Sequence, residues 1–154
     1  MKVFFKFKII FGFILSTLFL MMQCDHFPLD FLTPHNFNLD SSAHEIEVKT
    51  KQGAWLDGLS INGNEEQYVG LDYRIDNKDT TVYYNDYTVR YQKDGEAVSA
   101  VEIIGEWFNI KSPDRVTTQI SIDQNNSLID RSLKISLATG TESHFITVYQ
   151  YRKQ

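Results

Sequence analysis

The chain has 154 residues with 15 basic and 20 acidic side chains, a length that suits one domain once a targeting segment is set aside. The first 23 positions hold three lysines and no acid, so the remainder has 12 basic and 20 acidic residues, a net charge of −8. This balance disfavours a nucleic-acid partner, because no basic surface is available to neutralise a phosphate backbone. A single cysteine excludes an internal disulfide, so the fold must rest on a buried core.

The first 23 residues have the pattern of an export signal. Basic positions come first, and an apolar run from Ile9 to Met22 follows. The only cysteine, Cys24, stands directly after it, and this order resembles a bacterial lipoprotein signal peptide, in which that cysteine is lipidated. Gln23 occupies a position that is usually small, so an uncleaved anchor or an ordinary export signal stays an alternative. We expect residues 1–23 to be the signal peptide, Cys24 to carry the lipid, and the protein to lie in the cell envelope at the outer membrane, its face undetermined.

Residues 24–43 indicate an extended tether between the lipid and the domain. Pro28, Pro34 and several Asn and Ser residues interrupt any periodicity, as in poorly ordered spacers. Phenylalanines and leucines are scattered through the segment at irregular spacing. The sequence leaves open whether these side chains are solvated or dock on the domain that follows.

From residue 44 to residue 154, short alternating segments are separated by Asn, Asp, Ser and Gly, which is typical of half-buried antiparallel strands. Residues 98–104 fit either a strand or one helical turn. No segment sustains helical periodicity over ten residues. We therefore predict an all-β, immunoglobulin-like antiparallel β-sandwich of about seven or eight strands. The strands are expected at 45–49, 54–61, 68–75, 80–91, 107–110, 116–122, 133–137 and 145–150.

The last third of the chain has a recognisable pattern. A tryptophan begins a strand at Trp107–Ile110, Gln119–Ile122 alternates, an Asn-rich turn leads to Arg131, and the chain closes on Ile146–Gln150. This resembles the C-terminal half of BACON domains, Bacteroidetes-associated modules often found beside carbohydrate-active enzymes. The resemblance covers about 45 residues well, and His44–Lys49 is similar to the family's first strand. It implies an immunoglobulin-like sandwich that binds carbohydrate or mucin, or serves as a spacer, and it implies no catalytic motif.

Three of the shared positions favour structural roles. Trp107 is large and apolar enough to fill the space between two sheets. Arg131 follows a turn and has donors for carbonyl groups at the end of the sandwich. Gln150 has an amide that can pair with the backbone of a neighbouring strand. We expect these residues to serve folding rather than ligand binding.

Six of the eight tyrosines lie between residues 68 and 91. Exposed aromatic rings can stack on sugars while a tyrosine hydroxyl stays in water. If residues 80–91 form two strands, alternate tyrosines share a face, and Trp55 is a possible neighbour. The alternative is that tyrosine is a favoured strand residue and that the rings pack across strands. The candidate ligand-binding residues are Trp55, Tyr83, Tyr84, Tyr87 and Tyr91.

Signals for a metal, a cofactor or catalysis are weak. The four histidines lack ligand spacing, and the segment 123–127 resembles the start of a calcium loop but has Leu128 and Lys134 where glycine and an acid are required. Nucleophile-elbow, zinc-helix, phosphate-loop and dinucleotide motifs are absent. We therefore assign no catalytic residue, metal ligand or cofactor, and we expect no enzymatic activity.

The expected function is that of a glycan- or mucin-binding module held at the envelope by its N-terminal lipid. The alternative is a structural spacer or an accessory subunit that binds other envelope proteins. An exposed set of tyrosines on one face would favour the first function. Buried tyrosines together with an apolar patch elsewhere would favour the second.

Overall fold

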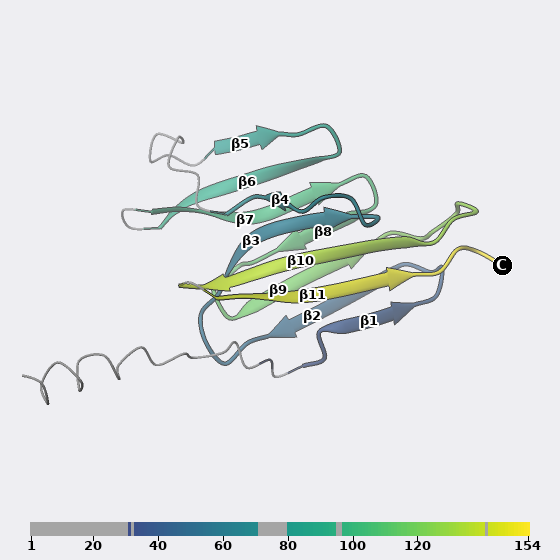
Figure 1. Cartoon of the computed structure of the whole chain (residues 1–154), viewed down its shortest axis with the longest axis horizontal. Helices are drawn as coiled ribbons and strands as arrows, with labels where there is room; N and C mark the ends of the chain where they lie inside the picture. Colours follow the sequence, from purple (N-terminus) through teal and green to yellow (C-terminus); the bar gives the residue numbers. More distant parts are fainter. Residues whose placement is uncertain (1–30, 32, 71–79, 95–96, 141) are drawn as a thin grey trace, which may run out of the picture.

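A computed structural model describes residues 31, 33–70, 80–94, 97–140 and 142–154. These residues form eleven β-strands and no helix (Figure 1). None of the described segments is a helix that would be long and apolar enough to span a membrane. The strands are β1 (Asn36–Leu39), β2 (His44–Lys49), β3 (Trp55–Ile61), β4 (Gln67–Tyr68), β5 (Thr80–Tyr83), β6 (Tyr87–Asp94), β7 (Ala97–Gly105), β8 (Phe108–Lys111), β9 (Thr117–Ile122), β10 (Arg131–Thr139) and β11 (Glu142–Gln150).

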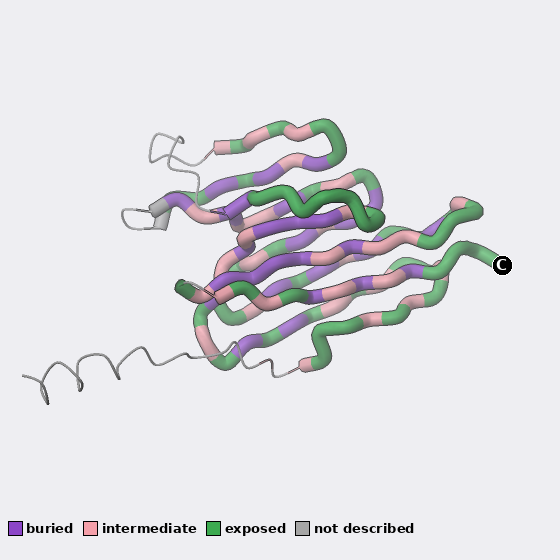
Figure 2. Tube along the Cα trace, in the orientation of Figure 1, coloured by how far each residue is buried: buried purple, intermediate pink, exposed green. Residues whose placement is uncertain are grey.

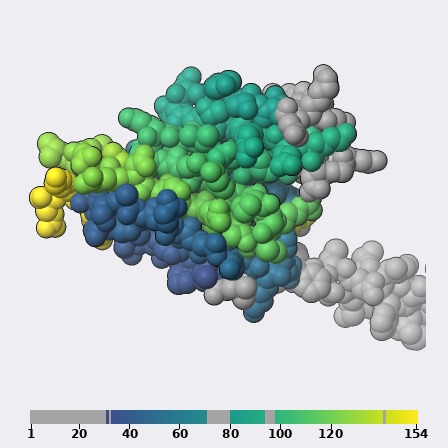
Figure 3. Space-filling model, turned by 180° about the vertical axis from the view of Figure 1, so that it is seen from behind, coloured from purple at the N-terminus to yellow at the C-terminus, as the bar shows by residue number. Residues whose placement is uncertain are grey.

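The strands follow one hydrogen-bonded path in the order β1-β11-β10-β3-β7-β8-β9-β2, with β4 beside β3 and β5-β6 beside β7. A single pair, Leu56 with Ala100, joins β3 to β7, so the path consists of two layers that meet along one side. Strands β1 and β2 follow each other in the chain but lie at the two ends of the path, which makes the sheet nearly closed. Seen from behind, the teal β5-β6 surface and the blue β2 surface flank the green β7-β9 surface (Figure 3).

The all-β, sandwich-like class predicted from the alternating pattern is confirmed. The structure has more strands than the expected seven or eight. Strand β1 was not expected, the segment 98–104, which fits a strand or a helical turn, lies in strand β7, and the expected segment 80–91 is divided between β5 and β6. Of the expected strand 68–75, Tyr68 ends β4, and residues 71–75 lie outside the described residues.

The core is built from the inward positions of the alternating strands (Figure 2). Along β9 the buried residues are Thr118, Ile120 and Ile122, while Gln119 between them is exposed. Leu133, Ile135 and Leu137 of β10 likewise face inward. Full burial of one such aliphatic side chain stabilises the fold by about 1.5–3 kcal/mol, so the period-two pattern is the main source of stability.

Part of the expected tether belongs to the folded unit. Strand β1 pairs in parallel with the C-terminal strand β11, and Phe31 forms an isolated bridge with Thr50. Phe31, Phe37 and Leu39 pack against the core. The folded domain therefore begins before His44. Of the two alternatives for these apolar side chains, docking on the domain is the one observed. Their burial offsets the entropy lost when the segment becomes ordered. The expected signal peptide and the lipidation site at Cys24 lie outside the described residues.

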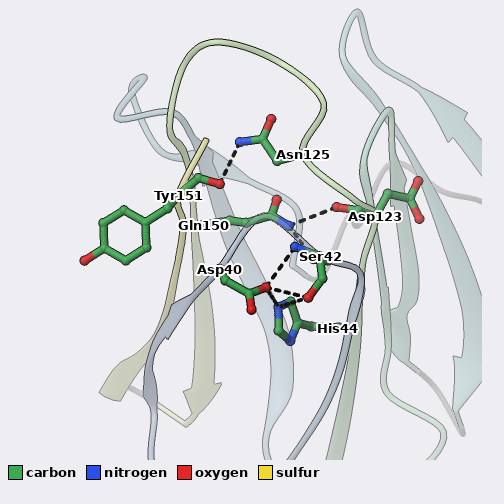
Figure 4. Close-up of polar contacts among 7 residues, drawn as sticks. All are labelled: Asp40, Ser42, His44, Asp123, Asn125, Gln150 and Tyr151. Atoms are coloured by element: carbon green, nitrogen blue, oxygen red, sulfur yellow. Dashed lines mark hydrogen bonds and ion pairs between the residues drawn. The ribbon is translucent and has the colours of Figure 1, made fainter. Parts of the chain in front are cut away.

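Gln150 connects distant segments at one end of the sandwich (Figure 4). Its carboxamide is fully buried, and Nε2 donates to the carbonyl oxygens of Ser42, at 2.8 Å, and Asp123, at 3.1 Å. The Gln150 amide therefore pairs with backbone groups, but these belong to two connecting segments and not to a neighbouring strand. It holds the β1-β2 connection against the β9-β10 connection.

Asn125 holds the same end of the sandwich and was not singled out from the sequence. Its Nδ2 donates to the carbonyls of Ile129 and Tyr151, while Oδ1 accepts from the backbone and hydroxyl of Ser127. Its own backbone N–H donates to the Ser41 carbonyl at 2.8 Å. One buried amide therefore fixes the Asn-rich turn as a compact loop.

Trp107 and Arg131 meet at this end as well. Trp107 is buried in the core, as expected. The guanidinium carbon of Arg131 lies 5.3 Å from the centroid of the Trp107 ring. Its Nη1 atom is buried and has no hydrogen-bond partner, so a cation–π contact with the tryptophan takes the place of the carbonyl contacts expected from the sequence.

We predict that Gln150→Met lowers the free energy of unfolding by about 2 kcal/mol, because the substitution keeps the shape but leaves two carbonyl oxygens without their donor. Urea denaturation followed by tryptophan fluorescence measures the change. Gln124→Met is the matched control, since Gln124 is exposed in the neighbouring connection and should change stability by less than about 0.5 kcal/mol. Equal stability of the two variants would contradict a fastening role for the Gln150 amide.

Candidate functional site

A pocket of about 440 Å³ opens between β3 and β6. Its buried surface comes from Leu59 and Tyr87, and Ile61 and Tyr84 are half-buried beside them. The rim is polar and exposed, and its residues are Asn64, Glu65, Gln67, Asn85 and Asp86. An apolar floor with a few polar groups around it, within a volume of about 300–1,000 Å³, is typical of small-ligand sites.

Two turns position this rim. Asn62 and Gly63 follow β3 with φ values of 53° and 75°, and an Asn-Gly pair is favoured in a tight turn because both residues tolerate the left-handed region. Asn62 also exchanges two hydrogen bonds with the backbone of Ser132, at 2.8 and 3.0 Å. The Ser60 hydroxyl donates to the Asn64 carbonyl. The turn is therefore anchored to both β3 and β10.

The second turn connects β5 to β6. The backbone N–H of Tyr84 donates to the carbonyl of Tyr87 at 2.9 Å, which leaves Asn85 and Asp86 at the tip. The rings of Tyr84 and Tyr87 are stacked, with centroids 4.7 Å apart and planes inclined by 18°. Both turns lie at the end of the sandwich where the chain terminates (Figure 1).

The hydroxyl of Tyr87 is the unusual polar group of this pocket. The residue is only 7% exposed, and its hydroxyl oxygen is buried without a hydrogen-bond partner. Burial, together with the neighbouring Tyr84 and Asp86, raises the pKa of Tyr87 to about 12. A buried hydroxyl without a partner costs free energy that the fold does not recover.

The structure does not assemble the expected tyrosine platform. Tyr83 is 80% exposed, but Tyr87 and Tyr91 are buried in the core. The period-two argument failed because β5 ends at Tyr83, which pairs with Thr88, so the hairpin turn interrupts the alternation. Tyr83 and Tyr87 therefore do not follow one another along a single strand.

Trp55 lies apart from the paired tyrosines. It stands at the first position of β3, whereas Leu59 and Ile61 of the tyrosine pocket are near the other end of that strand. Trp55 lines a separate pocket of about 210 Å³, together with Arg115 and residues of β6 and β7. Of the five candidates, only Tyr84 and Tyr87 are brought together in one site.

A second polar cluster, Asp40, Ser42 and His44, contains the residue types of a catalytic triad (Figure 4). Asp40 Oδ1 and the Ser42 hydroxyl both contact His44 Nε2, at 2.9 and 3.2 Å, and the hydroxyl also bonds to Asp40. A catalytic triad needs the acid and the nucleophile on opposite nitrogens of the histidine ring. Here both groups contact Nε2, so the cluster does not have the arrangement of a triad. Hydrogen bonds from Ser42 lower the pKa of Asp40 to about 2, as expected for a carboxylate that fixes a turn.

The described residues contain no group of three or more His, Cys, Asp or Glu side chains that could hold a metal ion. The turn that resembles the start of a calcium loop instead directs its Asn125 side chain to backbone and serine groups of the same end.

The comparisons with known proteins inform the fold. No family model matches the chain, and no curated protein matches it. An NMR structure of a protein from Bacteroides thetaiotaomicron is similar, with a TM-score of 0.56 and 13% identity over 83% of this chain and 90% of that chain. At this identity the similarity concerns the fold alone.

A second solved structure, a Bacteroides ovatus GH5 xyloglucanase in complex with a XXXG heptasaccharide, aligns with 81% of this chain and 19% of that chain. The identity is 11% and the TM-score is 0.38. A similarity of this size carries no conclusion about this protein.

Sequence reasoning missed the polar rim of the tyrosine pocket. Glu65 and Gln67 lie between the expected strands 54–61 and 68–75, and Asp86 lies inside the expected strand segment 80–91, so none of them was a candidate. A usable signal was present: Tyr84-Asn85-Asp86-Tyr87 has two turn-forming residues between aromatics, which is typical of a hairpin turn. The sequence could not show that the two turns lie together at one pocket, because this arrangement arises only in the tertiary fold.

We predict that stability falls between pH 10 and pH 12 partly because of Tyr87. Its folded-state pKa is raised to about 12, so its neutral form favours folding below the unfolded pKa of about 10, and this contribution is lost as pH rises towards 12. In Tyr87→Phe the alkaline decline should be shallower, and stability at pH 7 should be unchanged or higher by about 1 kcal/mol. Urea denaturation across this pH range measures both quantities.

Tyr83→Phe is the control, since Tyr83 is exposed and should follow the wild-type pH course. A Tyr87→Phe protein that loses stability at pH 7 would show that the Tyr87 hydroxyl has a structural partner after all.

Proposed function

We propose that this protein is a non-catalytic, BACON-like module of the cell envelope that binds carbohydrate through the pocket of Tyr84 and Tyr87. The observation that carries the proposal is the pocket itself, in which two stacked aromatic rings meet a rim of amides and carboxylates. Aromatic faces complement the C–H faces of sugar rings, and side-chain amides and carboxylates complement their hydroxyl groups. The pocket of Trp55, which also has an aromatic ring beside an amide and a carboxylate, is smaller, at about 210 Å³.

The proposed placement in the envelope rests on the N-terminal sequence. A basic start, an apolar run and a cysteine at position 24 support lipidation at Cys24 and attachment to the outer membrane. The described chain enters the sandwich at the end opposite to the tyrosine pocket (Figure 1). A module anchored in this way holds the pocket away from the membrane, where glycans are accessible.

We predict that Tyr84→Ala weakens binding to a responsive glycan at least tenfold, because the half-buried ring is the aromatic surface beside the opening. The ligand is first found by screening the protein on an array of mucin-type and plant glycans, and affinities are then measured by calorimetry. Tyr83→Ala is the matched control, because Tyr83 is adjacent in sequence but does not line the pocket.

Retained affinity in Tyr84→Ala would remove the pocket from the proposal, and loss in Tyr83→Ala alone would move the site to the exposed side of β5. If millimolar glycans of every class fail to bind the wild type, carbohydrate binding is excluded.

A second candidate function, that of an accessory subunit binding envelope proteins, is favoured by a different observation. Leu128 and Ile129 are 82% and 66% exposed at the tip of the β9-β10 connection, and Tyr151 is exposed near them. Asn125 bonds to the carbonyls of Ile129 and Tyr151, so the backbone that presents these apolar residues is held in one arrangement. Preorganised apolar side chains on a small rigid loop suit a protein interface.

For this function we predict that Leu128→Ser with Ile129→Ser leaves the free energy of unfolding within about 0.5 kcal/mol of wild type. The same variant should abolish recovery of specific partners after cross-linking in the native envelope. The glycan affinity of the tyrosine pocket should not change. Unchanged partner recovery would exclude this loop as the interface.

A further inference from the structure

We infer that the tyrosine pocket selects uncharged sugars with neighbouring hydroxyl groups and rejects sialylated, sulfated and uronic-acid glycans. The inference rests on the proposed carbohydrate binding and adds the ligand class. Its basis is the charge of the lining. Among the nine lining residues, the side chains charged at neutral pH are those of Glu65 and Asp86, and none of the nine is basic.

Several other carboxylates of the described surface have a cationic partner. Glu47 contacts Lys49 at 2.9 Å, Glu66 contacts Lys134 at 3.5 Å, and Glu102 contacts Arg90 at 2.9 Å. No ion pair joins Glu65 or Asp86 to a described residue. Their negative charge is therefore uncompensated within the described residues, at the rim of a concave site where the field is focused.

A carboxylate at neutral pH only accepts hydrogen bonds, so it suits pairs of sugar hydroxyls, which can both donate to it. Asn64, Gln67 and Asn85 add groups that donate as well as accept. An anionic substituent would face two like charges without a cation to receive it.

The test uses the full-length protein and glycans in matched pairs, a neutral oligosaccharide and the same oligosaccharide with one added sialic acid or one sulfate. We expect the neutral member to bind at least tenfold more tightly at low ionic strength, since a like charge within several ångströms raises the free energy of the complex. The difference should decrease as salt is added. The neutral member's own affinity should change little with salt.

A charge variant separates the local effect from the overall charge. Glu65→Gln with Asp86→Asn should reduce the difference within each pair to less than threefold. Glu47→Gln with Asp123→Asn removes the same two charges at exposed positions outside the pocket and should leave the difference intact.

Equal or tighter binding of the charged members overturns the inference and leaves carbohydrate binding standing. An unaltered difference in the pocket variant overturns it as well. If neither member of any pair binds the wild type, the proposed function fails, and the ligand class fails with it.

Discussion

The end of the sandwich at which β11 finishes depends on the buried carboxamide of Gln150. It lies at the last position of β11 and binds carbonyl groups of two connections that are 81 residues apart in the chain, at Ser42 and Asp123. One connection carries the chain from β1 to β2, the two ends of the strand path. Without a donor there, two backbone carbonyls beside the core would lack partners, which protein interiors rarely tolerate.

The tyrosine pocket is linked to this closed end through hydrogen bonds of the backbone. Asn62, in the turn that forms part of the pocket rim, bonds to Ser132 at the beginning of β10, next to Arg131 over Trp107. Within the part of the chain that the structure describes, the turn between β5 and β6 has no such bond to β10, and it rests on its own hairpin and on the stacking of Tyr84 with Tyr87. One wall of the pocket is thus fixed to the core, and the other is a hairpin tip. Binding groups on short turns above a rigid sheet are common in sandwich folds.

Alternation was enough to locate the strands that bury one face. Residues 116–122, 133–137 and 145–150 were expected as strands and are β9, most of β10 and most of β11. The positions that face the core follow from the same pattern, because side chains alternate sides along a strand. Alternation does not reveal strands that are ordered by pairing with another strand of the chain and not by burying one face. Strand β1 is such a case, since its four residues pair with β11 and only two of them are half-buried.

The site was less predictable than the fold because it combines turns that are distant in sequence. Tyrosine enrichment pointed to the correct hairpin, yet it could not distinguish Tyr84 beside the opening from Tyr91 in the core. That distinction depends on where the hairpin turn resets the alternation, a shift of one residue that exchanges inside for outside. Glu65 and Asp86 carried no signal of their own, because acids in turns are usually solvated.

The two surfaces at this end of the molecule differ in what a ligand would gain. At the loop of Leu128 and Ile129, the apolar groups are exposed on a backbone that Asn125 holds, so a partner would gain hydrophobic contact without ordering the loop. At the tyrosine pocket the apolar surface is mostly buried already, by the ring stack and Leu59. What remains exposed there is the polar rim, with its amides and its two carboxylates. In the proposed site, hydrogen bonds would therefore contribute more than apolar contact, and the pattern of donors on a ligand would decide which ligand binds.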